Sequence, residues 1–243
     1  MDATRAVLRL AGAIDAKDAW SGGALMIVQT GDEIDRGDSD RAILDMFERL
    51  SGEAKAAGGE VLALVGNHEV MNAQHDFRYV TPGAREAFQP EGREAAFTPG
   101  GSYAKKLASR PVVVKVGDDV FVHGGVLPKH IAYGVDRAND ETRDFFLGTR
   151  KDPPKVVTSE DGLTWTRMYS AAPAPEDCAV LDQALAKMGA KRMIVGHTVQ
   201  RNGITTACGE KVFRIDTGMS KVYEGKIQAL EIKSGAPKIL GSL

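Results

Sequence analysis

Four short apolar runs in this chain each lead into a side chain of a type that commonly binds metal ions. These side chains are Asp32, Asn67, His123 and His197. Because α/β sheets gather ligand sites at the carboxyl ends of their strands, we expect the four side chains to meet at one edge. A mixture of oxygen and nitrogen ligands suits a divalent cation of hard to borderline character. The sequence therefore predicts a metal centre of the kind that hydrolases use.

The size and composition of the chain suit a single globular domain. At 243 residues it can enclose a sizeable core, and we expect one domain over residues 1–243. The hydrophobic fraction of 43% is ordinary, and a net charge of -2 does not favour electrostatic binding to nucleic acid. No apolar stretch approaches the roughly 20 residues that span a bilayer. We expect neither a nucleic acid nor a membrane as partner, and the compartment stays open, with the cytoplasm as the default.

Two cysteines and two histidines are predicted to have no part in the chemistry. Cys178 and Cys208 have neither a metal-binding nor a redox spacing, and we expect both to remain thiols that are buried or idle. His75 and His130 lie in loop-like sequence that does not follow an apolar run. We expect both of these imidazoles to be solvated.

Apolar spacing predicts a mixture of helices and strands. Helical spacing covers residues 7–14, 43–50 and 181–188. Strand-like runs cover residues 26–28, 61–65, 112–116, 120–122, 193–195, 212–215 and 228–232. The glycine at 117 favours a hairpin, and the two C-terminal runs resemble further antiparallel strands. The pattern predicts an α/β fold in which mixed sheets are covered by helices.

Two long segments, residues 74–101 and 136–174, resist assignment to helices or strands. Both contain several prolines, and the first also contains several glycines. Long irregular stretches inside a compact domain are more often functional loops than linkers. We expect both segments to be loops or lids that face the substrate.

The segment from Gly31 to Gly37 places two aspartates and an arginine directly after a predicted strand. The Asp32 carboxylate has two oxygens and can bridge two cations, although an aspartate after a strand is by itself more often a turn former. Arg36 offers planar paired donors that match a phosphate group, and its alternative is a surface salt bridge. The other three ligand segments favour the metal and phosphate interpretation.

Asn67 and His68 are neighbours with different chemical abilities. Asn67 can give a neutral amide oxygen to a metal, and His68 can deliver a proton to a leaving oxygen unless it is a buried structural histidine. His123 and His197 each stand beside a glycine that leaves room near the imidazole. Either one alone would be expected to be structural, but together with Asp32 they favour metal ligation.

Four motifs follow one another in a fixed order along the chain. They are Gly-Asp-x-x-Asp-Arg-Gly, Gly-Asn-His-Glu, His-Gly-Gly and Gly-His-Thr. In this order they resemble the phosphoprotein phosphatase family of the calcineurin-like metallophosphoesterases. Finer similarity to the bacterial Shewanella-like phosphatase branch lies in residues 66–72, 165–167, 196–200 and 215–220. The resemblance extends over nearly the whole chain.

The resemblance implies a fold and a set of residue roles. The fold would be a pair of mixed β-sheets sandwiched between helices, around two divalent metal ions, with manganese expected first and iron or zinc as alternatives. Asp32 would bridge the ions, and Asn67, His123 and His197 would complete the second metal site. The catalytic assignments are His68 as general acid, Asp35 as the residue that orients it, and Arg36 and Arg167 as phosphate-binding residues.

One motif of the family, Gly-Asp-x-His-Gly, does not occur in this sequence. In the family it ends the first strand and gives an aspartate and a histidine to the first metal. The sequence opens at Met1 with residues that resemble the helix after that motif. We therefore expect the chain to be N-terminally incomplete, with the first strand missing and only Asp32 left of the first metal site.

The resemblance implies hydrolysis of a phosphomonoester by a metal-activated hydroxide, with protonation of the leaving group by His68. The expected substrates are phosphoserine, phosphothreonine or phosphotyrosine in a protein, or a small phosphoester. Two alternatives remain open. A dinucleoside polyphosphate hydrolase uses similar residue clusters, and a degenerate phosphatase without the first motif would bind a phosphorylated partner without turnover.

Overall fold

A five-stranded sheet forms one half of the sheet system in the computed structural model, which describes residues 1–241. Its order is β3-β4-β5-β7-β6, and β4, β5 and β7 run parallel while β3 and β6 pair antiparallel at the two edges. The strands are β3 (Val113–Val116), β4 (Asp119–Val122), β5 (Arg192–Val195), β6 (Thr205–Ala207) and β7 (Val212–Arg214). The predicted hairpin at Gly117 is confirmed by the pairing of β3 with β4.

The N-terminal half contains a second sheet, which is a parallel pair. Its strands are β1 (Met26–Gln29) and β2 (Glu60–Ala63), joined by α2 (Asp40–Ala56), which packs against β2. This confirms the predicted order of strand, helix and strand. The preceding helix α1 (Asp2–Leu10) is amphipathic and buries Leu8 in a small core that it shares with α2. The predicted helical stretch therefore ends four residues earlier than the spacing suggested.

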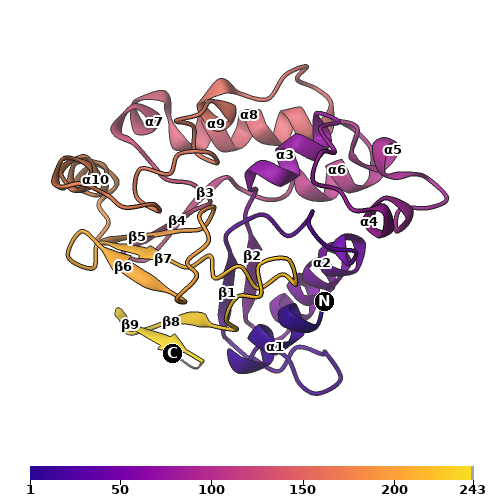
Figure 1. Ribbon diagram of the computed structural model, residues 1–243, viewed down its shortest axis with the longest axis horizontal. Helices are drawn as coiled ribbons and strands as arrows, with labels where there is room; N and C mark the ends of the chain where they lie inside the picture. Colours follow the sequence, from indigo (N-terminus) through magenta and orange to yellow (C-terminus); the bar gives the residue numbers. More distant parts are fainter. Residues whose placement is uncertain (242–243) are drawn as a thin grey trace.

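The remaining helices form a layer beside the sheets, which runs along the top of Figure 1 and down to its left and right edges. They are α3 (Asn67–Ala73), α4 (Pro82–Glu86), α5 (Arg93–Phe97), α6 (Ser102–Leu107), α7 (Pro128–Tyr133), α8 (Val135–Leu147), α9 (Lys155–Thr158) and α10 (Pro175–Met188). The main core lies between this layer and the five-stranded sheet. The α/β class with sheets among helices, expected from the sequence, is confirmed.

The expectation that residues 74–101 and 136–174 are loops is wrong for much of both segments. The first contains α4 and α5, and the second contains most of α8 and all of α9. Pro82 stands in the first turn of α4, where a proline lacks no helical hydrogen bond, so it starts this helix instead of excluding it. Helix α8 buries Phe145 and Phe146 in the main core, and this packing outweighs its polar composition.

The C-terminal strands pair differently from one another. β7 pairs antiparallel with β6, as expected, but parallel with β5 on its other side. A separate hairpin follows, made by β8 (Ala229–Lys233) and β9 (Ala236–Leu240). It lies below the five-stranded sheet in Figure 1, at the yellow end of the chain.

The expectation of two thiols is wrong, because Cys178 and Cys208 form a disulfide. Cys178 lies on α10 and Cys208 follows β6, and their Cα atoms are 5.3 Å apart. The two residues are 30 positions apart in the sequence, and neither lies in a recognisable motif. Only the packing of the helix beside the edge of the sheet brings them together.

The two histidines that were expected to be solvated differ in the structure. His75 is exposed, as predicted, and contacts the Thr98 hydroxyl. His130 is buried, which corrects the prediction. Its Nδ1 accepts a hydrogen bond from Leu127 N, so its Nε2 donates to the Asp161 carbonyl, and burial lowers its pKa to about 4. His130 therefore stabilises the start of α7 as a neutral side chain.

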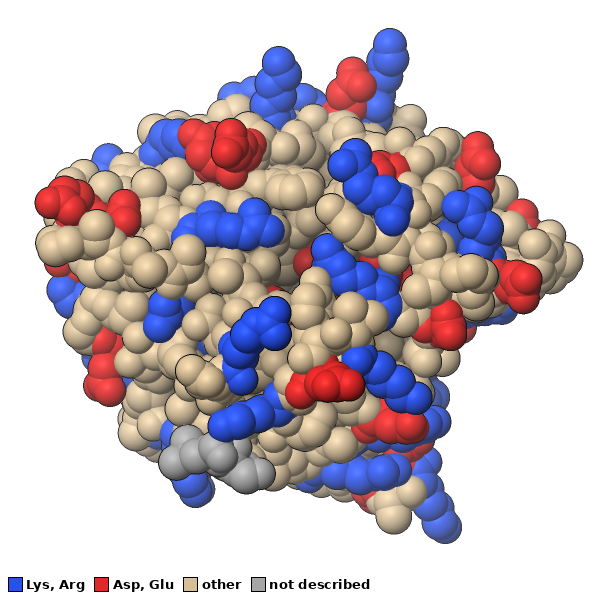
Figure 2. All heavy atoms as spheres, in the orientation of Figure 1, with Lys and Arg blue, Asp and Glu red and all other residues tan. Residues whose placement is uncertain are grey.

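The surface shows no broad region of one charge on the face in Figure 2, where basic and acidic side chains alternate. This distribution agrees with the small net charge of -2. Within residues 1–241, none of the helices combines the length and the apolar character needed to cross a bilayer.

Candidate metal centre and active site

Four predicted ligands meet where the strands of the two sheets end. His123 Nε2 lies 3.1 Å from Asp32 Oδ2, 3.0 Å from Asn67 Oδ1 and 3.2 Å from His197 Nδ1. Asp32 follows β1, Asn67 opens α3 after β2, His123 follows β4 and His197 follows β5. The sequence prediction that these four side chains converge is therefore met by the geometry.

The protonation of His123 indicates what this cluster can hold. His123 Nδ1 lies 2.8 Å from the Thr30 carbonyl oxygen, which can only accept, so Nδ1 carries a proton. In the neutral ring the Nε2 lone pair then faces the carboxylate of Asp32, the amide oxygen of Asn67 and the Nδ1 of His197. Burial works to lower the pKa of His123, but the charge and hydrogen bond of Asp32 outweigh it and raise the pKa. Either a proton on His123 Nε2 or a metal ion can therefore offset the repulsion among these groups. The donor set of two oxygens and two imidazole nitrogens fits a divalent transition metal ion.

The electrostatics of the cluster agree with a cation site. Burial works to raise the pKa of Asp32, but the charges and hydrogen bonds of His123 and His68 outweigh it and hold the pKa below its ordinary value. Burial lowers the pKa of His197 to about 3, with further contributions from the charges of His123 and Arg167. Asp32 therefore stays anionic and His197 neutral, which are the forms that bind metal ions.

Two glycines let the loops after β1 and β2 cross in close contact. A Cβ atom on Gly31 would lie 2.4 Å from Gly66 N, and one on Gly66 would lie 2.2 Å from Asp32 Oδ1. Asp32 itself has a φ of 59°, and His197 has a φ of 63°. Left-handed backbone at non-glycine residues costs free energy and concentrates at functional sites, where the surrounding structure enforces it.

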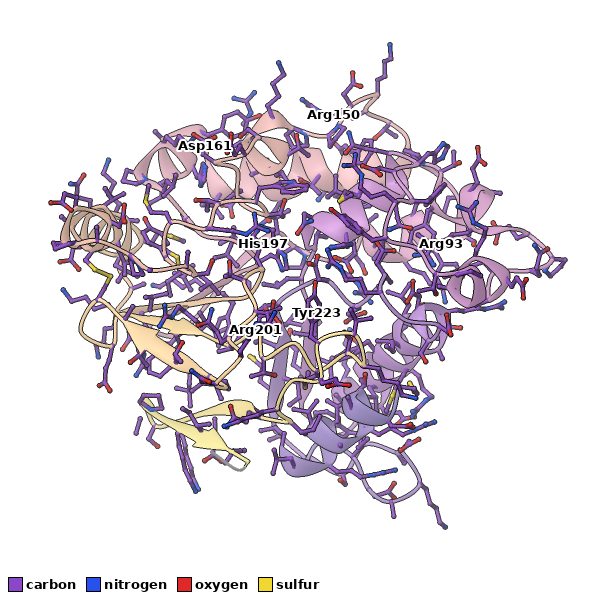
Figure 3. All side chains as sticks on the ribbon, viewed as in Figure 1. Arg93, Arg150, Asp161, His197, Arg201 and Tyr223 are labelled. Carbon is purple, nitrogen blue, oxygen red and sulfur yellow. A yellow bond between two sulfur atoms is a disulfide. The ribbon has the colours of Figure 1, made fainter. Side chains whose placement is uncertain are left out.

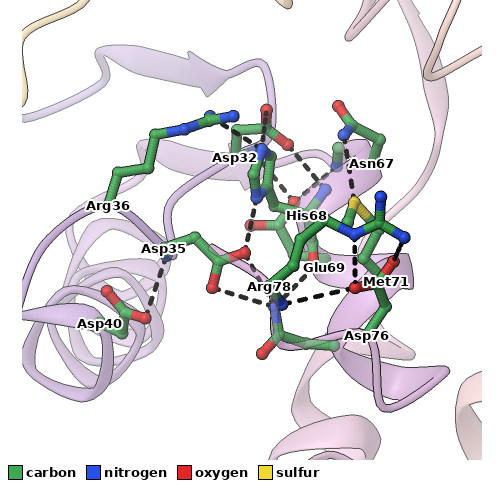
Figure 4. A network of polar contacts seen from close by, with 12 residues as sticks. Asp32, Asp35, Arg36, Asp40, Asn67, His68, Glu69, Met71, Asp76 and Arg78 are labelled. Atoms are coloured by element: carbon green, nitrogen blue, oxygen red, sulfur yellow. Dashed lines mark hydrogen bonds and ion pairs between the residues drawn. The ribbon is translucent and has the colours of Figure 1, made fainter. Parts of the chain in front are cut away.

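His68 and Asp35 form a buried pair beside the cluster, which is drawn in Figure 4. His68 Nδ1 lies 2.6 Å from Asp35 Oδ2, and Asp32 Oδ1 accepts a hydrogen bond from the backbone nitrogen of His68. Burial works to lower the pKa of His68, but the hydrogen bond to Asp35 and the charges of Asp32 and Asp35 outweigh it and raise the pKa. His68 is therefore suited to hold a proton near neutral pH.

Arg36 and Arg167 both line the cavity that opens over the cluster. The cavity measures about 1350 Å³, and its lining includes Asp32, His68 and His197. Arg36 Nη1 lies 2.9 Å from His68 Nε2, and because a guanidinium can only donate, Nε2 accepts in this arrangement. The charge of Arg36 also works to lower the pKa of His68, so a proton on Nε2 requires this contact to open, as it would when Arg36 turns to a bound anion. Arg167 is exposed on the loop before α10, and its charge acts on His197. The two arginines add positive charge to the cavity beside the proposed cation site. The cavity therefore suits an anionic ligand.

Arg93 is a part of the site that the sequence analysis did not identify. Its side chain is 1% exposed and pairs with Asp35 Oδ1 at 3.1 Å and Asp40 Oδ2 at 2.8 Å. Its Nε also donates to Asn72 Oδ1, and the Asn72 amide in turn donates to Asp35. Arg93 therefore fixes the carboxylate that orients His68, although it lies in a segment predicted to be irregular.

Glu69 connects the two glycine loops from within the core. Its carboxylate accepts hydrogen bonds from the backbone nitrogens of Asp32, Glu33 and Gly66, at 2.8 to 2.9 Å, and its side chain is fully buried. The sequence motif contained Glu69 but gave it no role. These three bonds fix the backbone on which Asp32 and Asn67 stand.

A calcineurin-like phosphoesterase family model matches residues 2–201 of this chain. The chain belongs to this family. It is a hydrolase of the metallophosphoesterase type, and the family implies divalent metal ions.

Individual relatives agree with this assignment. The chain is 38% identical over 282 residues to Shewanella-like protein phosphatase 2 of Arabidopsis thaliana, a match that covers 96% of this chain and 72% of that protein. It is 33% identical over 232 residues to Shewanella-like protein phosphatase 1 of Plasmodium berghei, covering 90% of this chain and 64% of that protein. These matches confirm the resemblance to Shewanella-like phosphatases that the motifs predicted.

The fold is also similar to a solved structure, the cold-active protein-tyrosine phosphatase of a psychrophilic Shewanella species. The TM-score is 0.85 with 26% sequence identity, and the match covers 98% of this chain and 73% of that one. A Saccharomyces cerevisiae protein serine/threonine phosphatase shares the fold with a TM-score of 0.67 at 14% identity.

Proposed function

We propose that this chain hydrolyses phosphomonoesters of protein side chains, and that residues 1–243 form one metallophosphoesterase domain. The observation that supports the reaction most strongly is the convergence of four potential ligand atoms from Asp32, Asn67, His123 and His197 beside a buried His68–Asp35 pair. Protein phosphatases among the relatives support a phosphorylated protein as substrate.

In this proposal Asp32, Asn67, His123 and His197 hold a divalent cation, with Mn²⁺ as the first choice and iron or zinc as alternatives. Asp32 would also help to hold the other ion of a two-metal site, as the resemblance implies. When bound, such ions supply Lewis acidity at the phosphate and activate a water molecule.

The side chains of the chain itself would bind the phosphate and move the proton. Arg36 and Arg167 would bind the phosphate oxygens, since guanidinium groups match them in charge and planar geometry. His68 would give its proton from Nε2 to the leaving oxygen as the ester bond breaks. Asp35 would hold the ring through Nδ1 and favour the protonated form that this step needs.

The test compares the wild-type chain with Asp32→Asn and with Asp140→Asn, a control on the exposed face of α8. We expect Asp32→Asn to lower hydrolysis of para-nitrophenyl phosphate in Mn²⁺ by about a hundredfold or more, since Lewis-acid stabilisation is worth several kcal/mol. Mn²⁺ affinity, measured by calorimetry, should fall in the same variant and stay unchanged in the control. Full activity of Asp32→Asn would contradict the proposal.

The same assay separates the two alternatives. Faster turnover of diadenosine tetraphosphate than of a phosphopeptide would favour a dinucleoside polyphosphate hydrolase. Tight binding of the phosphopeptide without release of phosphate would favour a degenerate phosphatase that acts as a binding protein.

A further inference from the structure

The imidazole of His197 lacks the hydrogen bond that usually orients a metal-binding histidine. Its Nε2 atom is buried and has no hydrogen-bond partner among residues 1–241, whereas the Nδ1 atom of His123 faces the Thr30 carbonyl oxygen at 2.8 Å. Histidines that bind metals almost always donate their second ring nitrogen to an acceptor, which fixes the ring. Figure 3 shows His197 near the middle of the molecule, between the helices along the top of the view and the strands below.

An indole ring supplies a different contact to this imidazole. The ring centroids of Trp165 and His197 are 5.8 Å apart and their planes are inclined at 76°, which is an edge-to-face arrangement that aromatic rings prefer. Trp165 is half-buried and lines the cavity over the cluster. Its side chain has only two torsions, so packing can hold the large ring at a low cost in conformational entropy.

Residues 162–170, the segment that carries this indole, are anchored to the loop after His123. The Leu163 carbonyl accepts hydrogen bonds from Gly124 N at 2.9 Å and from Gly125 N at 3.2 Å. A Cβ atom on Gly124 would lie 2.9 Å from the same carbonyl oxygen, so a larger residue there would push the two segments apart. The segment and the His123 loop therefore hold each other in a fixed position.

The same segment is also anchored to the loop after His197. The hydroxyl oxygens of Ser170 and Thr198 lie 2.7 Å apart. The side-chain amide of Gln200 donates to the carbonyls of both residues, at 3.0 Å to Ser170 and 2.8 Å to Thr198. The segment thus connects the two loops that present the imidazoles of the cluster, and the indole lies between these two anchor points in the sequence.

We propose that Trp165 is a positioning residue for metal binding, whose indole holds the His197 ring in place of a hydrogen bond to Nε2. In this orientation Nδ1 of His197 lies 3.2 Å from His123 Nε2, within the cluster. The inference rests on the proposed function, in which His197 is a metal ligand. Without the indole the imidazole would be freer to turn, and ordering it when an ion binds would cost conformational entropy.

The experiment measures Mn²⁺ binding without any phosphate, by electron paramagnetic resonance of the free ion. It compares the wild-type chain with Trp165→Leu, Trp165→Phe and Trp20→Leu. Trp20 is the second of the two tryptophans and packs against the small core near α1. We expect Trp165→Leu to lower the affinity by about two- to tenfold, the range of an aromatic pair. Trp165→Phe should keep most of the affinity, because a phenyl ring can still pack edge-to-face, and Trp20→Leu should keep all of it.

A double-mutant cycle tests whether Trp165 acts through His197. His197→Gln should weaken Mn²⁺ binding by itself. Adding Trp165→Leu to this variant should then cause no further loss, because the ring that the indole holds is no longer present. Urea midpoints of all variants, measured with a chelator, separate a loss of metal affinity from a loss of folding.

Four results would overturn the inference: wild-type Mn²⁺ affinity in Trp165→Leu, an equal loss in Trp165→Phe, a loss of the same size in Trp20→Leu, or an undiminished effect of Trp165→Leu in the His197→Gln background. A changed KM for para-nitrophenyl phosphate with wild-type Mn²⁺ affinity would assign Trp165 to substrate binding instead. The proposed function fails separately. Unchanged Mn²⁺ affinity in His197→Gln would refute the metal site, whereas weaker binding in His197→Gln beside full affinity in Trp165→Leu would refute the role of Trp165 alone.

Discussion

Removal of the buried arginine Arg93 should destabilise the fold far more than removal of an exposed arginine with the same number of carboxylate partners. Arg93 neutralises Asp35 and Asp40, whose side chains are 0% and 2% exposed. Loss of one partner from a buried ion pair costs about 3–5 kcal/mol. Arg93 also donates to Asn72 Oδ1 and the Ala84 carbonyl, and leaving buried acceptors unpaired costs about 1–3 kcal/mol more.

We therefore expect Arg93→Met to lower the free energy of unfolding by about 4–8 kcal/mol. For a chain of this length, the corresponding fall in melting temperature is roughly 8–32 °C. The control is Arg143→Met on α8, because Arg143 also faces two carboxylates, those of Asp140 and Asp144. These side chains are about half exposed, and exposed pairs contribute about 0–1 kcal/mol each.

Urea unfolding in the presence of a chelator measures both variants without a contribution from bound metal. Burial raises the pKa of Asp40 although Arg93 opposes it, so the variant should raise this pKa further. A carboxylate with a raised pKa in the folded state contributes stability at low pH and loses it as pH rises through that pKa. The deficit of Arg93→Met should thus be larger at pH 8 than at pH 5, and adding Asp40→Asn should recover part of it. A loss no greater than that of Arg143→Met would refute the reasoning.

Three further predictions concern His68, the disulfide and His130. His68→Asn should slow hydrolysis of an alkyl phosphate far more than that of para-nitrophenyl phosphate, whose leaving group needs little protonation; equal losses in kcat would argue against a general acid. Because it closes a loop between residues 30 positions apart, the disulfide should contribute about 2–4 kcal/mol, so Cys178→Ser with Cys208→Ser should lower the urea midpoint, and an unchanged midpoint would disprove this. His130 is neutral in the fold with a pKa of about 4, so stability should fall as pH drops from about 6.5 to 4 while the unfolded chain takes up the proton. The same pH slope in His130→Asn would contradict that assignment.

Local sequence was sufficient to predict the cluster and its neighbours. Asp32, Asn67, His123 and His197 each follow a short apolar run, and parallel strands place their carboxyl ends at one edge. The helix periodicity of α2 and α10 and the turn at Gly117 are also local signals, because each depends on residues a few positions apart. These elements appeared in the structure close to their expected positions.

Contacts between distant segments were beyond such reasoning. Arg93 and Asp35 are 58 positions apart, and nothing in a proline- and glycine-rich stretch indicates that one of its arginines neutralises a buried carboxylate. The same holds for the disulfide and for the burial of His130.

The sequence by itself therefore determined which chemical groups this protein has and the order in which strands present them. The tertiary structure alone decided their charge states and their neighbours. The physical reason is that a pKa, an ion pair or a ring contact depends on burial and on distances of a few ångströms, which are set only when remote segments pack together.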